Sequence, residues 1–315
     1  MVAARASGAN RALRMAVDGR SGWNTRADWC IIPPPQTGGL PPPRQTPLKG
    51  SAHVERSIRP VSEQKTTKTP ASPGPDEDRL FAEPRERVDD FRFNAATAAV
   101  FDDMVSRSVP FYGEIQRIVG ELAADFGVPG SRLYDMGCAT GTTLAALDPL
   151  VDPEVNFVGI DNSDDMLGRA REKLGAVAGH RRLDLVNADL DRGVDVDDAS
   201  VVVMILTLQF VRPLQRERLV RRVFAGMRKD AALILVEKIT SPHTLLNRLF
   251  IKNYYEFKRR NGYSQVEIAQ KREALENVLI PYRYEENVQM LHDVGFTQVD
   301  EVFRWYNFCC MVAVK

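Results

Sequence analysis

Residues 133–141 read Leu-Tyr-Asp-Met-Gly-Cys-Ala-Thr-Gly, an apolar strand that runs into a glycine-bearing turn. Glycine suits a turn in which the backbone must pass close to a ligand. Residues 142–147 predict the start of a helix, and residues 155–160 predict a second apolar strand that ends at Asp161. A carboxylate at that position can accept hydrogen bonds from ribose hydroxyls. Strand, turn, helix, strand and acid, in this order, predict a nucleoside-binding site.

Proline and charge are unevenly distributed along the chain. Residues 1–75 contain 11 of the 19 prolines, 11 lysines or arginines and only 4 acidic residues. Such a segment buries too little apolar surface to offset its ordering entropy, so residues 1–80 are predicted to be a disordered extension. Because the whole chain has 42 basic and 42 acidic side chains, the rest is acidic overall. An acidic domain repels phosphate backbones, which indicates a small-molecule substrate and no direct binding of nucleic acid.

The composition also argues against metal and membrane sites. The 4 cysteines and 4 histidines show no C-x-x-C or Cys/His spacing, which predicts reduced thiols, a cytoplasmic protein and no metal site. The sequence contains no apolar run of about 18 residues, so no transmembrane segment is predicted.

The order of elements predicts an α/β fold. A helix at residues 112–126 precedes the first strand, and further apolar strands then alternate with helical segments. We place these later strands at residues 183–186, 200–206 and 231–236. Such alternation is typical of a doubly wound parallel sheet.

The pattern changes after residue 238. Residues 241–282 look helical and highly charged, and we interpret them as a helical insert. A helix at 285–294 then leads to two closing strands, 297–305 and 308–314, with no helix between them. This ending predicts a mostly parallel, seven-stranded sheet with an antiparallel last strand. Residues 90–315 are therefore predicted to form one Rossmann-like catalytic domain.

Six short motifs are spread along this domain. They are Arg107-Ser108-Val109-Pro110, Tyr134-Asp135, Ile160-Asp161-Asn162-Ser163, Thr207-Leu208-Gln209-Phe210, Asn261-Gly262-Tyr263-Ser264 and Gln270-Lys271-Arg272. In these motifs and their spacing, the chain from about Phe91 onward resembles the carboxy-S-adenosyl-L-methionine synthase family. That family lies within the class I S-adenosyl-L-methionine (SAM) methyltransferase superfamily, whose generic members lack the motifs of the helical insert.

The resemblance implies a specific reaction. SAM would be the acceptor of a one-carbon carboxyl group rather than a methyl donor, and carboxy-SAM would be the product. Prephenate would supply the carbon dioxide as it becomes phenylpyruvate. A separate enzyme would use carboxy-SAM to make 5-oxyacetic acid at the tRNA wobble uridine. The resemblance also implies a homodimer.

The family's ligand-binding positions carry over one at a time. The matching residues are Tyr112, Gly137, Cys138, Ala139, Asp161, Asn162, Asp189, Leu190, Ile205 and Arg272. Asp161 and Asn162 match the ribose-contacting pair, and Asp189 matches a residue at the adenine edge. Three positions depart from the family pattern, since Ala139 replaces a serine, Leu190 an isoleucine and Ile205 an asparagine.

Two of these residues are predicted to be catalytic. A carboxylated methyl group is an anion, which a guanidinium can bind through two hydrogen bonds, and Arg272 is predicted to provide it. Tyr112 would donate its phenol to the same carboxylate. Lys258, Arg259 and Lys271 could help to hold the prephenate dianion, but a charged run of this kind is more often a solvated helix face, so they stay outside the predicted site. Glu237 and Lys238, at the end of a strand, are candidates for a base.

Two alternative functions stay open. A conventional SAM-dependent methyltransferase of small molecules needs only the nucleoside site. A SAM-binding protein without catalytic activity is compatible with the replacements at Ala139 and Ile205. Methylation of nucleic-acid bases is disfavoured, because residues 205–208 lack the Asp- or Asn-Pro-Pro-aromatic turn that such enzymes commonly use.

Overall fold

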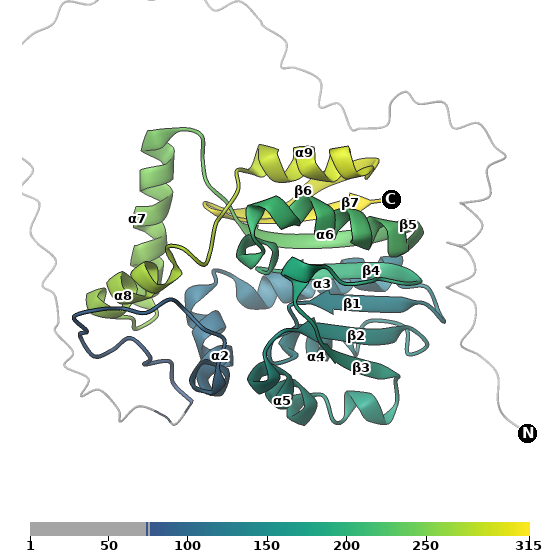
Figure 1. The fold of residues 1–315 in the computed structure, drawn as a ribbon, viewed down its shortest axis with the longest axis horizontal. Coiled ribbons are helices and arrows are strands. Elements are labelled where there is room, and N and C mark those ends of the chain that lie inside the picture. The colour runs from purple at the N-terminus through teal and green to yellow at the C-terminus, as the bar shows by residue number, and fades with distance from the viewer. Residues whose placement is uncertain (1–73, 75) are drawn as a thin grey trace, which may run out of the picture. The chain divides into compact units, whose positions relative to one another are not determined.

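The computed structural model of the chain describes residue 74 and residues 76–315, so the predicted extension at residues 1–80 lies almost wholly outside the described residues. Within the described part, seven strands form one sheet in the order β3-β2-β1-β4-β5-β7-β6 (Figure 1). The strands are β1 (Arg132–Met136), β2 (Asn156–Asp161), β3 (Leu183–Asn187), β4 (Ala199–Ile205), β5 (Met227–Lys238), β6 (Gln298–Trp305) and β7 (Phe308–Val314).

The direction of the strands confirms the predicted fold class. Strands β1 to β5 run parallel to one another, with Met136 beside Ile160 and Val203 beside Ile234. Strand β7 is antiparallel to both β5 and β6. The closing pair is therefore a hairpin, as predicted, but its second strand is inserted between β5 and β6 and leaves β6 at the edge.

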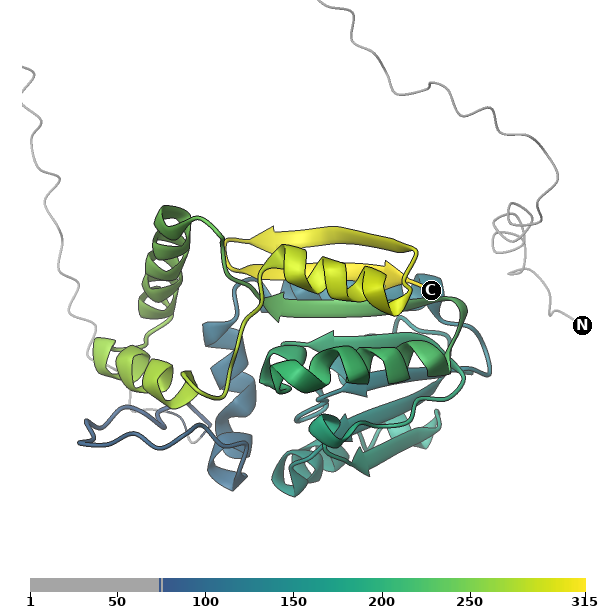
Figure 2. The same cartoon turned by 45° about the horizontal axis from the view of Figure 1, so that its top comes forward.

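Helices cover both faces and one end of the sheet. Those in the described residues are α2 (Ala95–Ser108), α3 (Tyr112–Phe126), α4 (Thr142–Leu147), α5 (Asp164–Lys173), α6 (Pro213–Gly226), α7 (Thr244–Arg260), α8 (Gln265–Leu275) and α9 (Tyr284–Val294). Short 3-10 turns are η2 (Val177–Gly179), η3 (Leu190–Arg192) and η4 (Leu208–Phe210). Helices α2, α7 and α8 gather beyond one end of the sheet (Figures 1 and 2).

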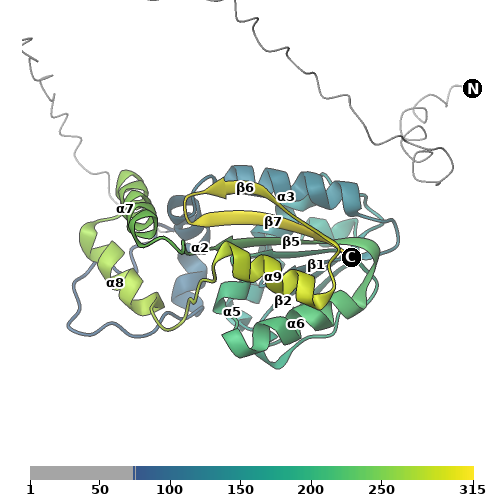
Figure 3. The same cartoon turned by 90° about the horizontal axis from the view of Figure 1, so that it is seen from above.

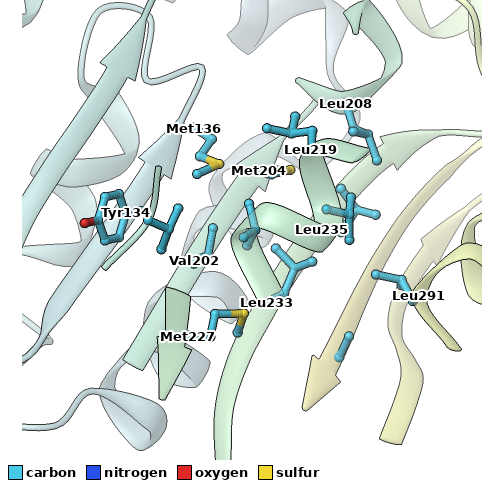
Figure 4. Packing of buried hydrophobic residues seen from close by; sticks show 14 of the residues in the cluster. Tyr134, Met136, Val202, Met204, Leu208, Leu219, Met227, Leu233, Leu235 and Leu291 are labelled. Carbon is cyan, nitrogen blue, oxygen red and sulfur yellow. The ribbon is translucent and has the colours of Figure 1, made fainter. Parts of the chain in front are cut away.

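Alternation of side chains along the strands creates two cores. Tyr134 and Leu233 point toward α6 and α9, whereas Leu133 and Ile234 point toward α3, α4 and α5. Figure 3 shows α6 and α9 on one side of the sheet and α3 on the other, and Figure 4 shows the packing of the α6 side. Strands β1 and β4 are apolar on both faces because helices cover both.

The helical insert divides into two helices at Gly262. Helix α7 ends at Arg260, and Gly262 follows with a φ of 90°, a conformation that glycine adopts without strain. Ser264 then caps α8 by accepting from the Glu267 backbone N–H at 3.2 Å, while the Glu267 carboxylate accepts from the Ser264 N–H at 2.8 Å. The chain thereby turns sharply and places α8 against α7.

Strand β5 starts earlier than the sequence predicted. We expected a strand from Ala231, but the strand begins at Met227, which pairs with Ala199. Asp230 has a φ of 59°, and its backbone N–H donates to the Lys315 carbonyl at 3.2 Å. An unusual backbone conformation at one residue therefore lets a charged stretch continue an apolar strand.

The packed region also starts earlier than the predicted boundary at residue 90. Asp78 and Phe81 are only 2% and 8% exposed. The Asp78 carboxylate accepts hydrogen bonds from the Tyr263 hydroxyl at 2.6 Å and from Lys271 Nζ at 3.3 Å. The sequence shows no sign of this packing, because the side chains that contact Asp78 lie in α2, in α8 and just before α8, away from it in the sequence. No described helix is both long and apolar enough to cross a membrane.

The Asp78 contacts predict a large effect of one substitution. Asp78→Ala would leave the buried Lys271 ammonium without its ion-pair partner, so the free energy of unfolding should fall by roughly 3 kcal/mol. Urea denaturation at pH 7 measures this change. Glu77→Ala is the matched control, because the Glu77 side chain is 37% exposed and its contact with Arg107 spans 4.0 Å. Equal, small losses for both variants would show that residues 76–81 do not hold the helical insert in place.

Candidate active site

A cavity of about 370 Å³ lies where the carboxyl ends of β1 to β5 meet α2, α7 and α8. Parallel strands bring their carboxyl ends to one edge of a sheet, where α/β proteins commonly bind ligands. Nine of the ten residues predicted from the sequence line this cavity. They are Tyr112, Gly137, Cys138, Ala139, Asp161, Asn162, Asp189, Leu190 and Ile205.

The turn after β1 depends on Gly137. Its φ is 79°, and a β-carbon at this position would lie 2.5 Å from the Thr207 side chain, so only glycine fits. Ala139 also has a positive φ, of 47°. Burial raises the pKa of the Cys138 thiol, which keeps it neutral. The turn therefore presents mainly backbone to the cavity, and the replacement of serine by Ala139 leaves that backbone in place.

Asp161 fixes the relation between this turn and the end of β2. Its Oδ2 accepts from the Ala139 backbone N–H at 3.0 Å, and its Oδ1 accepts from the Ser163 N–H at 2.9 Å. Burial raises the pKa of this carboxyl, while the backbone hydrogen bonds from Ser163 and Ala139 lower it. Each oxygen keeps lone pairs that can accept from hydroxyl groups. Asn162 lies beside it and is exposed.

The ends of β3 and β4 form the next part of the wall. Asp189 caps η3, since its Oδ1 accepts from the Asp191 N–H at 3.0 Å. Leu190 is half-buried beside it. Ile205 ends β4, and its carbonyl accepts from the Thr207 hydroxyl at 3.2 Å. Because an isoleucine side chain has no polar atom, the backbone of Ile205 is its only means of making a polar contact with a ligand.

Tyr112 lines the cavity, and a buried acid, Asp135, lies close to it behind the cavity wall. Burial, and then the negative charge of Asp135, raise the pKa of Tyr112 to about 12, so its phenol stays protonated and can donate. Asp135 is 1% exposed, and its Oδ2 has no hydrogen-bond partner among the described residues. Burial and the charge of Asp161 raise the pKa of Asp135 to about 8. The sequence analysis named Asp135 within the Tyr134-Asp135 motif but gave it no role at the site.

Arg272 is the predicted site residue that the structure places elsewhere. Its side chain is exposed and does not line the cavity of a single copy of the chain, so its predicted contact with the carboxylate stays a prediction. The helical phase of α8 explains the difference. Successive residues are about 100° apart around a helix, and α8 buries Lys271 and Ala274. Arg272 therefore turns outward where its neighbour turns inward.

Three lysines outside the predicted site line the cavity instead. They come from three elements, with Lys238 at the end of β5, Lys258 in α7 and Lys271 in α8. Lys258 and Lys271 are 5% and 6% exposed. The sequence suggested Lys238 only as a candidate base, and the charged surroundings of Lys258 and Lys271 favoured a solvated face. The structure shows that all three line the cavity.

One acidic side chain of helix α2 forms hydrogen bonds with the turn that follows β1. Asp102 Oδ1 accepts from the Thr140 hydroxyl at 2.7 Å and the Thr142 hydroxyl at 3.0 Å, and its Oδ2 accepts from Lys173 Nζ at 2.6 Å. These contacts close the cavity on the side of α2. Among residues 76–315, no group of three His, Cys, Asp or Glu side chains is arranged to hold a metal ion.

The chain is similar to a known domain family and to several solved structures. A family model described as a methyltransferase domain matches residues 134–233. Among solved structures, a putative O-methyltransferase from Nostoc punctiforme is 15% identical with a TM-score of 0.49, and the alignment covers 70% of this chain and 59% of that one.

Curated relatives are much more similar. A carboxy-S-adenosyl-L-methionine synthase from Methylococcus capsulatus is 53% identical over 239 residues, which are 76% of this chain and 99% of that protein. A protein of the same name from Sulfurimonas denitrificans is 45% identical and covers 71% of this chain and 94% of its own length. By this similarity along nearly the whole length of its relatives, the chain belongs to the carboxy-S-adenosyl-L-methionine synthase family.

Proposed function

We propose that the protein is an enzyme that converts SAM and prephenate to carboxy-SAM and phenylpyruvate. The observation that carries this proposal is the combination of two kinds of surface in one cavity. Strand ends with Asp161 and Asp189 form a nucleoside-type wall, while Lys238, Lys258 and Lys271 line the same cavity. A cation-bearing wall suits a reaction whose second substrate and product both carry carboxylates. The names of the relatives agree with it.

Atoms and charges balance when water is the third product. Decarboxylation of prephenate moves an electron pair into its ring, which becomes aromatic as the ring hydroxyl leaves with a proton from the SAM methyl group. The resulting carbanion beside the sulfonium then forms a bond to the carbon of carbon dioxide. SAM, a monocation, and the prephenate dianion thus give neutral carboxy-SAM and the phenylpyruvate monoanion. The departing hydroxyl takes up the methyl proton, so no protein base is required.

The proposed binding mode follows the cavity wall. The side-chain oxygens of Asp161 and Asn162 accept hydrogen bonds from the ribose hydroxyls. The backbone beyond β3, at Asp189 and Leu190, contacts the edge of the adenine. Asp135 lies behind the cavity wall near Tyr112, and its negative charge favours the ammonium group of the amino-acid part of SAM on the cavity side. Tyr112, as a protonated phenol, donates to the new carboxylate. Asp161 and Asp189 are already held in position by backbone hydrogen bonds.

The cellular context is proposed from the family alone. Carboxy-SAM would pass to a separate enzyme that modifies the tRNA wobble uridine, so this chain itself would not bind nucleic acid. A homodimer in the cytoplasm is part of the same proposal.

A conventional SAM-dependent methyltransferase is the second candidate, favoured by the match of the methyltransferase-domain model to residues 134–233. The lysines count against it, because a methyl group in transfer carries positive charge and gains nothing from nearby ammonium groups. A binding protein without catalysis is the third candidate, and turnover distinguishes it.

Incubation of the purified protein with SAM and prephenate tests the proposed reaction directly. Mass spectrometry should find a nucleoside heavier than SAM by one carbon dioxide, and phenylpyruvate should appear in equal amount. Omission of prephenate is the control and should give no carboxy-SAM. Formation of S-adenosylhomocysteine with a methylated product would favour the methyltransferase, and no turnover would favour the binding protein.

Asp161→Asn tests the nucleoside wall. The amide has one acceptor oxygen where the carboxylate has two, and we expect a loss of roughly 1.5–3 kcal/mol in SAM binding, or about 10- to 100-fold in Kd. Calorimetric titration with SAM measures it. Asp165→Asn is the matched control, because Asp165 is exposed in the first turn of α5 and does not line the cavity. Similar SAM affinities for the two variants would place the ribose elsewhere.

A further inference from the structure

The lysines of the cavity come from separate elements but share one aromatic side chain. Lys238 Nζ lies 4.7 Å from the centroid of the Tyr254 ring, and Lys258 Nζ lies 5.7 Å from the same centroid. Tyr254 is itself part of the cavity wall. The two ammonium groups are therefore neighbours across one ring, where the end of β5 faces α7 (Figure 1).

The three lysines differ in how their charges are compensated. Lys271 Nζ lies 3.3 Å from Asp78 Oδ2, and both side chains are buried. Among the described residues, neither Lys238 nor Lys258 has a carboxylate within 4.0 Å. Lys258 instead faces the rings of Tyr254 and Tyr263. A buried ammonium that lacks an anion is costly, so an anion that enters this cavity and pairs with Lys258 removes that cost.

The surroundings of Lys258 favour its neutral form in the empty cavity. Burial, and then the positive charges of Lys271 and Lys238, lower the pKa of Lys258 to about 7, although Asp78 and Glu267 act in the opposite direction. Burial lowers the pKa of Lys238 to about 8. The phenols of Tyr254 and Tyr263, whose pKa values burial raises, stay neutral beside them. A bound anion would reverse the effect of burial and charge both lysines.

We infer that Lys238 and Lys258 form a dicarboxylate subsite, in which each ammonium group receives one carboxylate of the dianionic second substrate. This inference rests on the proposed function and extends it by naming the residues that bind prephenate. Lys271 is a positioning residue here, because its ammonium group is already paired with Asp78 and its charge reinforces the demand for an anion at Lys258.

The subsite would also bind the substrate more tightly than the product. Prephenate enters with two carboxylates and satisfies both lysines. When one carboxylate leaves the ring as carbon dioxide and is transferred to the SAM methyl, the aromatic product keeps only one. Phenylpyruvate therefore makes one ionic contact fewer than prephenate and leaves more readily.

Lys258→Gln tests the subsite. The amide keeps most of the side-chain length but has no charge, so the KM for prephenate should rise roughly 10- to 100-fold, the effect of one lost charge-assisted hydrogen bond. Inhibition by phenylpyruvate should weaken only a few-fold, and the calorimetric Kd for SAM should stay within a factor of about two. Lys252→Gln is the matched control, because Lys252 lies in the same helix but is exposed and does not line the cavity.

The pH dependence gives an independent readout. In the wild type, prephenate affinity should be highest at or below pH 7 and should fall as the pH rises toward 9, because the free lysines lose their protons over that interval. In Lys258→Gln the fall should be shallower and should begin nearer pH 8. The variant should also unfold at a urea concentration at least as high as the wild type, since it no longer buries an uncompensated ammonium group.

Failure of the inference and failure of the proposed reaction look different. If the wild type binds prephenate in calorimetry, Lys258→Gln does not, and neither turns over, the subsite stands and the proposed reaction fails. If the wild type turns over and Lys258→Gln keeps its KM for prephenate, the reaction stands and the subsite is wrong. Equal loss of SAM and prephenate affinity in Lys258→Gln would assign the lysines to the SAM carboxylate and would also overturn the subsite.

Discussion

The parallel direction of β1 to β5 is the constraint on which the rest of the structure depends. It requires each connection to cross the sheet, which places α3 to α5 on one face and α6 on the other, and it brings five strand ends to one edge. Backbone groups at those ends have no further strand partners. The turn at Gly137, the carboxylate of Asp161 and the ammonium of Lys238 meet there because each residue lies at or just after the last ladder pair of its strand.

The same edge explains which parts could be predicted from the sequence. Strand ends follow from apolar runs that stop at polar or turn residues, and eight of the nine predicted positions that line the cavity lie at or near these ends. Tyr112, at the start of α3, and Arg272, in α8, lie on helices and were taken from the family resemblance alone. Choosing between Lys271 and Arg272 needs the rotation of α8, and two adjacent cations give no periodic signal of which one faces inward.

The packing of residues 76–90 could not be predicted from the sequence, for a different physical reason. Residues 76–90 have no helix or strand in the structure, so no periodic pattern could reveal them. Their order comes from side chains far away in the sequence, since Asp78 pairs with Lys271 and with Tyr263. Contacts of this kind depend on tertiary packing alone. The strained backbone at Ala139 was equally hidden, because a positive φ at a non-glycine residue is held by the surrounding fold.

The position of β7 between β5 and β6 has a consequence for how the chain folds during synthesis. Strand β6 is made before β7 but pairs only with it, so β6 cannot dock on the sheet until residues 308–314 have emerged from the ribosome. Until then β5 is an open edge of apolar residues such as Leu233 and Ile234. Open apolar edges recruit strands from other molecules. Aggregation of nascent chains is therefore a hazard late in translation, and completion of β7 removes it.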